Sequence, residues 1–281
     1  MSLPDRVFVL GAGRAGLGLT RALRASGVLV VGVHGRREAG GEDYVTAGAL
    51  PAAIAQATVA IVAVRDGQLD DALAELLAAP FPAGAVVLSA SGSAEREALD
   101  AVRDRGHPGG TFHPLLPLAE PARAATLLRG SWVGIDGDAP ARDVAARLAA
   151  ALGASTLEIP PGAKGRYHAA AVMASNFPVV LLSEAVRMLT DSGITEAEAR
   201  AAARSLFFAA VENLRHESEA AALTGPIARG DAPTVRRHRA ALGDDAELLA
   251  LYDALSRGAV RLARTRGVRQ EELTEIERLL G

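Results

Sequence analysis

The stretch from Val7 to Thr20, VFVLGAGRAGLGLT, constrains the fold of this chain more than any other. A short apolar run leads into Gly11, Gly13 and Gly16, which have the Gly-x-Gly-x-x-Gly spacing, and a helical apolar pattern follows from about Arg14. In a βα unit that binds a dinucleotide, the first glycine permits a tight turn, the second lets backbone approach a pyrophosphate, and the third lets helix and strand pack closely. The stretch therefore predicts a βα unit that binds a dinucleotide, with the phosphates at the N-terminus of its helix. An ordinary βα turn is the alternative.

Composition excludes several classes of protein. The chain has 281 residues, is 49% apolar and 22% charged, and carries a formal net charge of −3, which is typical of a globular protein with room for two domains. That charge provides no basic field for a nucleic-acid backbone, so we expect no nucleic-acid partner. Because there is no cysteine and the six histidines lack metal-binding spacing, we also expect no metal.

Neither the N-terminus nor the apolar stretches predict a membrane protein. The N-terminus, MSLPDR, carries an acid and leads directly into the first strand, so it does not resemble a signal peptide. The longest apolar stretch, Ala169 to Leu182, is too short to span a bilayer and contains Ser175, Asn176 and Pro178. We therefore expect a cytoplasmic protein without a membrane segment.

The first half of the chain alternates strand and helix patterns, and the second half is helical throughout. Strand-like runs recur at 28–33, 59–64, 85–90, 110–113, 132–135 and 156–159, with helical patterns such as 69–79, 94–105 and 141–152 between them. This alternation predicts a doubly wound α/β Rossmann domain over residues 1–160. After Pro160, Pro161 and Gly162, helices at 163–190, 196–217, 233–242, 245–266 and 271–280 predict an all-α domain over residues 161–281, which we expect to bind substrate and to dimerise.

The end of the second strand indicates the cofactor. In NAD-binding units an acid about 20 residues beyond the glycines binds the adenosine ribose. Here the strand ends in His34, Gly35, Arg36 and Arg37, so two guanidiniums can pair with a 2′-phosphate. The sequence predicts NADP(H), although two solvated surface arginines would have the same pattern.

Polar residues also follow the third, fourth and fifth strands. Val64, Asp66, Ser89 and Ser91 would border a bound nicotinamide, or they act as helix caps. His113, before Pro114 and Pro117, would face the same edge of the sheet and contact substrate; a buried structural histidine is the alternative. The predicted cofactor residues are Gly11, Gly13, Arg14, Ala15, Gly16, His34, Arg36, Arg37, Val64, Asp66, Ser89 and Ser91.

The helix from Lys164 to Leu182 carries the clearest catalytic pattern. All 30 basic side chains are arginine except Lys164, in a chain where arginine otherwise supplies positive charge. At about 100° per residue, Lys164, His168 and Ser175 share one helix face and Asn176 borders it. We predict a catalytic site there, against the alternative of a buried helix with a few satisfied polar groups. A turn-rich loop at 223–238 could bring Arg229 to an anionic substrate, or could simply join two helices.

These motifs together resemble the superfamily of 6-phosphogluconate dehydrogenase, pyrroline-5-carboxylate reductase and ketopantoate reductase. The resemblance covers the whole length and is carried by GAGRAG, His113-Pro114, YHAAAVMASNF at 167–177 and LTGPIARGD at 223–231, which look like a branch with a helical domain of uncharacterised function. Known relatives place a lysine and, one turn later, an asparagine at the start of the corresponding helix. Lys164 fits the lysine, His168 occupies the next turn, and the asparagine follows only at Asn176. The resemblance also implies a homodimer.

The expected activity is NADPH-dependent reduction of a carbonyl or imine in a small anionic metabolite, such as a 2-oxo acid like ketopantoate or a cyclic imine. Lys164 would donate the proton, because burial can lower a lysine pKa toward neutrality, and His168 is the competing donor. Ser175 or Asn176 would orient the reacting group. The alternative is a protein that senses NADP(H) redox state without turnover, since a fold does not fix a function.

Overall fold

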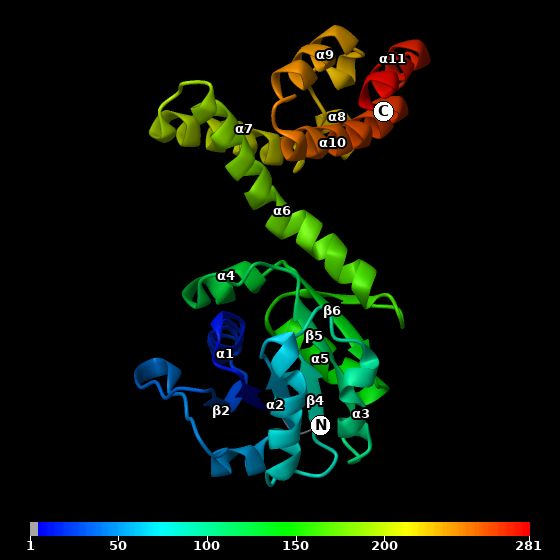
Figure 1. Ribbon diagram of the computed structural model, residues 1–281. Helices are drawn as coiled ribbons and strands as arrows, with labels where there is room; N and C mark the ends of the chain where they lie inside the picture. Colours follow the sequence, from blue (N-terminus) through cyan, green and yellow to red (C-terminus); the bar gives the residue numbers. More distant parts are fainter. Residues whose placement is uncertain (1–4) are drawn as a thin grey trace. The chain divides into compact units, whose positions relative to one another are not determined.

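The structure is a computed structural model that describes residues 5–281, so the predicted lead from residues 1–4 into the first strand lies outside the described residues. The chain divides into two compact units, the first ending at Val179 and the second covering Val180–Gly281. Each unit is described by itself (Figure 1).

A seven-stranded sheet forms the centre of the first unit, in the order β2-β1-β3-β4-β5-β6-β7. Its strands are β1 (Arg6–Leu10), β2 (Leu29–His34), β3 (Val59–Val62), β4 (Val86–Ser89), β5 (Gly109–Pro114), β6 (Trp132–Gly137) and β7 (Ser155–Glu158). Every neighbouring pair is parallel except β5 and β6. The predicted doubly wound, largely parallel sheet is confirmed. Strand β6 runs antiparallel to β5 because the connection between them stays at the carboxyl end of β5 and does not cross to the opposite end of the sheet.

Helices cover both faces of this sheet (Figure 1). They are α1 (Arg14–Ala25), α2 (Leu69–Ala78), α3 (Asp100–Arg103), α4 (Ala124–Leu128) and α5 (Ala139–Ala151). Short 3₁₀ helices lie in the connections between strands and helices: η1 (Gly41–Asp43), η2 (Ala52–Gln56), η3 (Asp66–Gln68), η4 (Arg96–Leu99) and η5 (Pro121–Arg123). Successive β1 residues alternate between the faces, with Val7 and Val9 packing on the side of α1 and α5 and Phe8 and Leu10 on the side of α2.

The predicted helix over residues 94–105 is only partly formed. The structure has the 3₁₀ turn η4 followed by the four-residue α3. Two side chains bind carbonyls that a regular helix would use: the Lys164 Nζ lies 2.5 Å from the Ala94 oxygen, and the Arg103 Nη1 lies 2.7 Å from the Arg96 oxygen. Helical turns therefore cover residues 96–103, a shorter span than the predicted helix.

The long helix α6 (Lys164–Asp191) belongs to both units, because the division falls inside it. Its start lies just beyond the predicted domain boundary at residue 160, after β7 ends. The helix continues through Pro178. Its length and a mean hydropathy of 1.5 over its most apolar window would allow it to cross a membrane, a property that a core helix of a soluble protein also has. The side chains of Met173, Phe177 and Val179 are exposed.

The second unit is helical, as predicted. It contains α7 (Glu196–Asn213), α8 (Glu219–Ala222), η6 (Ile227–Arg229), α9 (Ala232–Ala241), α10 (Ala246–Thr265) and α11 (Gln270–Leu280). The Thr195 hydroxyl accepts a hydrogen bond from the Glu198 amide and so caps the N-terminus of α7. A core of Val235, Val260, Leu273 and Ile276 joins α9, α10 and α11.

Candidate functional site

The three glycines of the β1–α1 turn meet different surroundings. Gly11 has φ +113°, and a Cβ there would lie 2.3 Å from the Ala63 oxygen. A Cβ on Gly16 would lie 1.8 Å from the Gly11 oxygen, so only glycine lets α1 pack this closely on the turn. At Gly13, by contrast, a Cβ would meet no described atom within 4 Å. Gly11 and Gly16 are therefore required for close packing of the turn, whereas Gly13 leaves space open.

That open space faces the N-terminus of α1. Gly13 is the N-cap residue, no side chain caps the helix, and no acid lies in its first turn. The first backbone N–H groups and the positive end of the helix dipole are therefore available to an anion.

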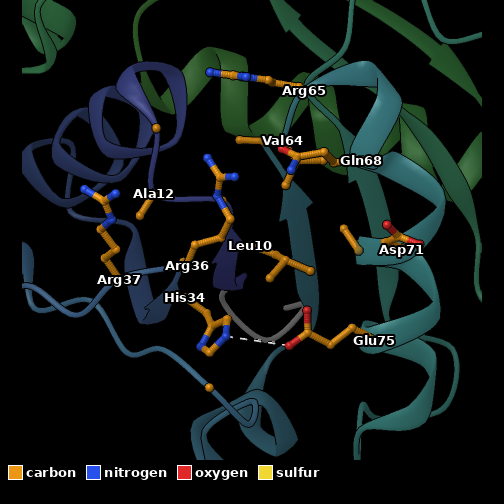
Figure 2. Close-up of a pocket in the computed structure, with 16 residues that line it drawn as sticks. Leu10, Ala12, His34, Arg36, Arg37, Val64, Arg65, Gln68, Asp71 and Glu75 are labelled. Atoms are coloured by element: carbon orange, nitrogen blue, oxygen red, sulfur yellow. Dashed lines mark ion pairs between the residues drawn. The ribbon is translucent and has the colours of Figure 1, made fainter.

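A cavity of about 900 Å³ extends from this turn across the carboxyl ends of β1, β2 and β3 (Figure 2). It is lined by Leu10, Gly11, Ala12, Gly13, His34, Gly35, Arg36, Arg37, Gly48, Ala63, Val64, Arg65, Gln68, Asp71, Ala72 and Glu75. Six of the predicted cofactor residues are among them, namely Gly11, Gly13, His34, Arg36, Arg37 and Val64. The other six, Arg14, Ala15, Gly16, Asp66, Ser89 and Ser91, do not line it.

Arg36 and Arg37 are exposed, and neither guanidinium has a hydrogen bond or ion pair within residues 5–281. Figure 2 shows both side chains beside the glycine turn, near Ala12. His34 differs from them because it is 4% exposed, its Nδ1 lies 2.9 Å from the Thr46 hydroxyl, and its Nε2 lies 3.6 Å from a Glu75 oxygen. The arginines are therefore free to bind a ligand, whereas His34 forms a fixed wall of the cavity.

Polar side chains at the ends of β3 and β4 bind one another. The Ser91 hydroxyl donates a 2.7 Å hydrogen bond to the Asp66 carboxylate, and the Ser93 hydroxyl donates to its other oxygen. The hydrogen bond from Ser93 is the main cause of a lowered pKa of Asp66, so this carboxyl is ionised at neutral pH. Ser89 is buried at the end of β4 and accepts a bond from the Ser91 amide. Asp66 thereby fixes the loop that follows β4.

Farther along the same edge lies a group that we call the histidine cluster: His113, Tyr167 and His168. The His113 Nδ1 is 2.8 Å from the Tyr167 hydroxyl, and the two imidazole rings lie edge to face with centroids 5.8 Å apart. Gly92 presses against both rings, because a Cβ on it would lie 2.6 Å from the His168 Nδ1 and 2.7 Å from the His113 Nε2. His168 Nδ1 is buried and has no hydrogen-bond partner in the part of the chain that the structure describes.

Burial shifts two pKa values in this cluster. It lowers the pKa of His113 to about 4, helped by the positive charges of His168 and Lys164 and opposed by Asp66. It also raises the pKa of Tyr167 to about 12. At neutral pH His113 is therefore a neutral imidazole, and Tyr167 keeps its proton.

Lys164 is 2% exposed and points to the protein interior. Its ammonium donates to the Ala94 carbonyl and to the Thr111 hydroxyl on β5. Burial lowers the pKa of Lys164, while Asp136 and Glu95 oppose that shift. The predicted lysine is thus next to the histidine cluster, but its hydrogen bonds go to the protein.

The other predicted catalytic residues on α6 bind within the helix. The Ser175 Oγ lies 2.7 Å from the Ala171 carbonyl oxygen and 2.9 Å from the Asn176 Oδ1, and its single proton can be donated to either. Arg229 lies exposed in η6 of the second unit, before Gly230 with φ 71°. For these three residues a role in catalysis or substrate binding stays a prediction.

Sequence reasoning did not select Tyr167, Gly92, Ser93 or Thr111. Tyr167 directly precedes His168, so it could have been chosen with that motif. Gly92 and Ser93 had no signal beyond their place in the loop after β4, and Thr111 had none beyond its place in β5. In the described residues no group of three or more His, Asp or Glu side chains is arranged to hold a metal ion.

The arrangement of a doubly wound sheet, a glycine turn opening on a large cavity and an all-helical second part defines a Rossmann-type fold with a C-terminal helical region. Residues 131–259 match the model of a domain family described as a domain of unknown function, DUF2520. No curated protein sequence matches the chain.

Three solved structures place this fold among known proteins. The protein TM1727 from Thermotoga maritima is 22% identical, with a TM-score of 0.73 over 92% of this chain and 99% of that one. The pyrroline carboxylate reductase of Plasmodium falciparum, solved with NADP bound, is 10% identical, with a TM-score of 0.62 over 97% and 98%. A reductive aminase from Aspergillus terreus, solved with NADPH and ethyl levulinate, is 18% identical, with a TM-score of 0.57 over 99% and 93%. The chain therefore shares its fold with NADP-binding reductases.

Proposed function

We propose that this protein is an NADPH-dependent reductase of a C=O or C=N bond in a small anionic metabolite, such as a 2-oxo acid or a cyclic imine. The observation that carries the proposal is the cavity at the β1–α1 turn, with Gly13 open at the start of α1 and two unpaired arginines at the end of β2. Two proteins that share the fold, a pyrroline carboxylate reductase and a reductive aminase, were solved with NADP and NADPH bound.

The cavity residues fit the two charged parts of NADPH. Its pyrophosphate would lie against Gly13, where a side chain is absent and the helix N–H groups point outward. Its 2′-phosphate would pair with Arg36 and Arg37, each charge-assisted hydrogen bond contributing about 1.5–3 kcal/mol. No acid occupies the end of β2, where it would favour NADH instead.

The order of the strands supports a reaction site beside this cavity. The cavity lies at the ends of β2, β1 and β3, and the next two strands, β4 and β5, lead to Gly92 and His113. When bound, the cofactor would supply the hydride. The protein would then have to supply a proton, and His168 and Lys164 are the two candidate donors.

Cofactor selectivity tests the first half of the proposal. We expect NADPH to bind at least about tenfold tighter than NADH, and Arg36→Ala combined with Arg37→Ala to remove that preference. Arg204→Ala combined with Arg261→Ala, which removes two exposed arginines of the second unit, is the control with the same net charge. Fluorescence titration measures the affinities of the three proteins for both cofactors. Equal binding of the two cofactors by the unmodified protein would contradict the assignment.

Turnover tests the second half. A panel of 2-oxo acids and cyclic imines, scored by NADPH oxidation at 340 nm, should contain a substrate. Tight and selective NADPH binding with no turnover across the panel would favour the alternative, a protein that senses NADP(H) redox state.

We also propose a cytoplasmic homodimer whose interface covers apolar residues of α6 and α7. Met173, Phe177 and Val179 on α6 and Leu206 and Phe208 on α7 are between 51% and 75% exposed, which is uncommon for large apolar side chains in a monomer. Light scattering should give the mass of two chains, and Phe177→Asp with Val179→Asp should give one. Binding of the protein to lipid vesicles, in place of dimer formation, would assign the apolar face of α6 to a membrane.

A further inference from the structure

The buried ammonium of Lys164 has a structural task. It joins α6 to two separate segments, the loop after β4 through the Ala94 carbonyl and strand β5 through the Thr111 hydroxyl. Thr111 is 1% exposed, so this junction is closed to solvent. Two of the three ammonium N–H groups are therefore already used inside the protein.

The loop that Lys164 binds is also held at its tip. Ser91 and Ser93 both donate to the Asp66 carboxylate, and Gly92 between them touches the rings of His113 and His168. Moving this loop would move the surface against which both imidazoles rest. Lys164 thus acts on the histidine cluster through the loop, without contacting it by a hydrogen bond.

The hydrogen bond between Tyr167 and His113 has a preferred direction. The phenol keeps its proton, and within the described residues His113 is the one hydrogen-bond partner of its hydroxyl. If Tyr167 donates, the bond occupies the lone pair of His113 Nδ1 and leaves the ring proton on Nε2. The reverse assignment would leave the phenol proton of a half-buried residue without an acceptor.

The Nε2 atom of His113 has no partner in the part of the chain that the structure describes, and it lies on the same side of Gly92 as the unpaired Nδ1 of His168. The charged or titratable groups that act on His113 are Asp66 from the loop after β3, and Lys164 and His168 from α6. Burial, His168 and Lys164 favour a neutral ring, and Asp66 opposes them without reversing the lowered pKa of His113.

We propose that Tyr167 fixes His113 as the neutral Nε2–H tautomer, a stationary hydrogen-bond donor to the oxygen or nitrogen of the substrate, and that His168 supplies the proton while Lys164 positions the loop. This inference rests on the proposed reductase function. In the step, hydride adds to the substrate carbon, the π electrons of the C=O or C=N bond move to the heteroatom, and that atom takes a proton from the His168 ring. His168 then regains a proton from water. His113 keeps its own proton throughout and lowers the energy of the charge that develops on the heteroatom.

Nitrogen NMR of the cofactor-free protein tests the tautomer. With ¹⁵N-labelled histidine at pH 7, His113 should show a protonated Nε2 and an unprotonated Nδ1, with its signals assigned from the spectrum of His113→Gln. Tyr167→Phe should increase the Nδ1–H form. The control is Tyr252→Phe, which removes the hydroxyl from the second His–Tyr pair, at 2.9 Å from His238, and should leave His113 unchanged. A proton on Nδ1 in the unmodified protein would overturn the assignment.

Kinetics separate the positioning role of Lys164 from proton donation. With a substrate found in the panel, Tyr167→Phe and His168→Gln should each lower kcat by about 10²-fold, the usual scale of acid–base catalysis, while the Kd for NADPH stays within about twofold. Lys164→Arg keeps the charge and the donors, and we expect it to retain kcat within about tenfold. A 10²-fold loss in Lys164→Arg with unchanged His113 signals would make Lys164 the acid. If no substrate reacts, the proposed reductase function fails, whereas the NMR experiment still decides the tautomer.

Discussion

The cofactor cavity and the histidine cluster lie along one edge of the same sheet, but they are built in different ways. The cavity is formed around backbone: a glycine turn, a helix N-terminus and two exposed arginines that bind nothing else in the described residues. The histidine cluster is formed by side chains from β5 and α6, which touch one another and are partly buried, with Gly92 of the loop after β4 packed against the rings. One region is open and preformed, and the other is packed.

This difference determines how each region should respond to substitution. A side chain added in the cavity occupies space meant for a ligand, so binding should suffer before folding does. A side chain added in the cluster displaces protein atoms, so stability and geometry should change while cofactor affinity remains. The following experiments test that contrast.

The largest effect is expected at Gly16, which belongs to the glycine turn but is closely packed against protein atoms, so both binding and folding should change. Gly16→Ala places a methyl group 1.8 Å from the Gly11 oxygen, so the turn must move. We expect NADPH affinity to fall by about 10³-fold or more, with a lower melting temperature, because strand β1 and helix α1 can no longer pack closely. Calorimetric titration and thermal unfolding measure both quantities. Native-like binding by this variant would show that the turn is not the phosphate site.

Gly13→Ala should separate binding from folding. No described atom lies within 4 Å of the added methyl group, so thermal stability should remain within about 1 °C of the original value. NADPH affinity should fall about 10- to 100-fold, because the methyl group occupies the place of the pyrophosphate. Gly258→Ala, in helix α10 of the second unit, is the control that leaves the cavity unchanged. Unaltered affinity in Gly13→Ala would place the phosphates elsewhere.

Gly92→Ala should give the opposite result. The new methyl group would lie within 2.7 Å of nitrogen atoms of both His113 and His168, so the rings must shift. We expect the free energy of unfolding to fall by about 1–3 kcal/mol and kcat to fall with it, while NADPH affinity stays within about twofold. Urea denaturation and cofactor titration compare the two. Loss of NADPH binding here would mean that the two regions are not separate.

The smallest effect is a pH dependence of stability. The pKa of His113 is about 4 in the folded protein, below its ordinary value of 6.5. Between these values the unfolded chain binds a proton that the folded chain does not, so stability decreases as the pH falls through this window. Between pH 7 and pH 5 this proton uptake should lower the free energy of unfolding of the first unit by about 1–2 kcal/mol. His113→Gln should remove that part of the pH dependence, which urea denaturation at the two pH values measures; an unchanged difference between them would contradict the low pKa.

Much of the fold was accessible from sequence because it depends on local patterns. The strand runs and the turn at Gly11 each lie within a few neighbouring residues, and the structure contains both. The helix over residues 94–105 was predicted too long: its helical turns cover only residues 96–103, and the Ala94 carbonyl before them is bound by Lys164, 70 residues away.

The candidate site divides in the same way. Gly11, Gly13, Arg36 and Arg37 were selected from motif spacing, and all four line the cavity. The prediction of Lys164 as a buried proton donor could not include Thr111, because nothing in the sequence places that hydroxyl beside the ammonium.

The sequence by itself thus determined the class of fold and the place for a dinucleotide, since both follow from periodicity and from the absence of side chains at fixed positions. Tertiary structure alone decided which polar groups are free. Lys164 and Ser175 are bound within the protein, whereas Arg36 and Arg37 are not. The physical reason is that a hydrogen bond depends on distances of about 3 Å between atoms that the chain brings together only when it folds.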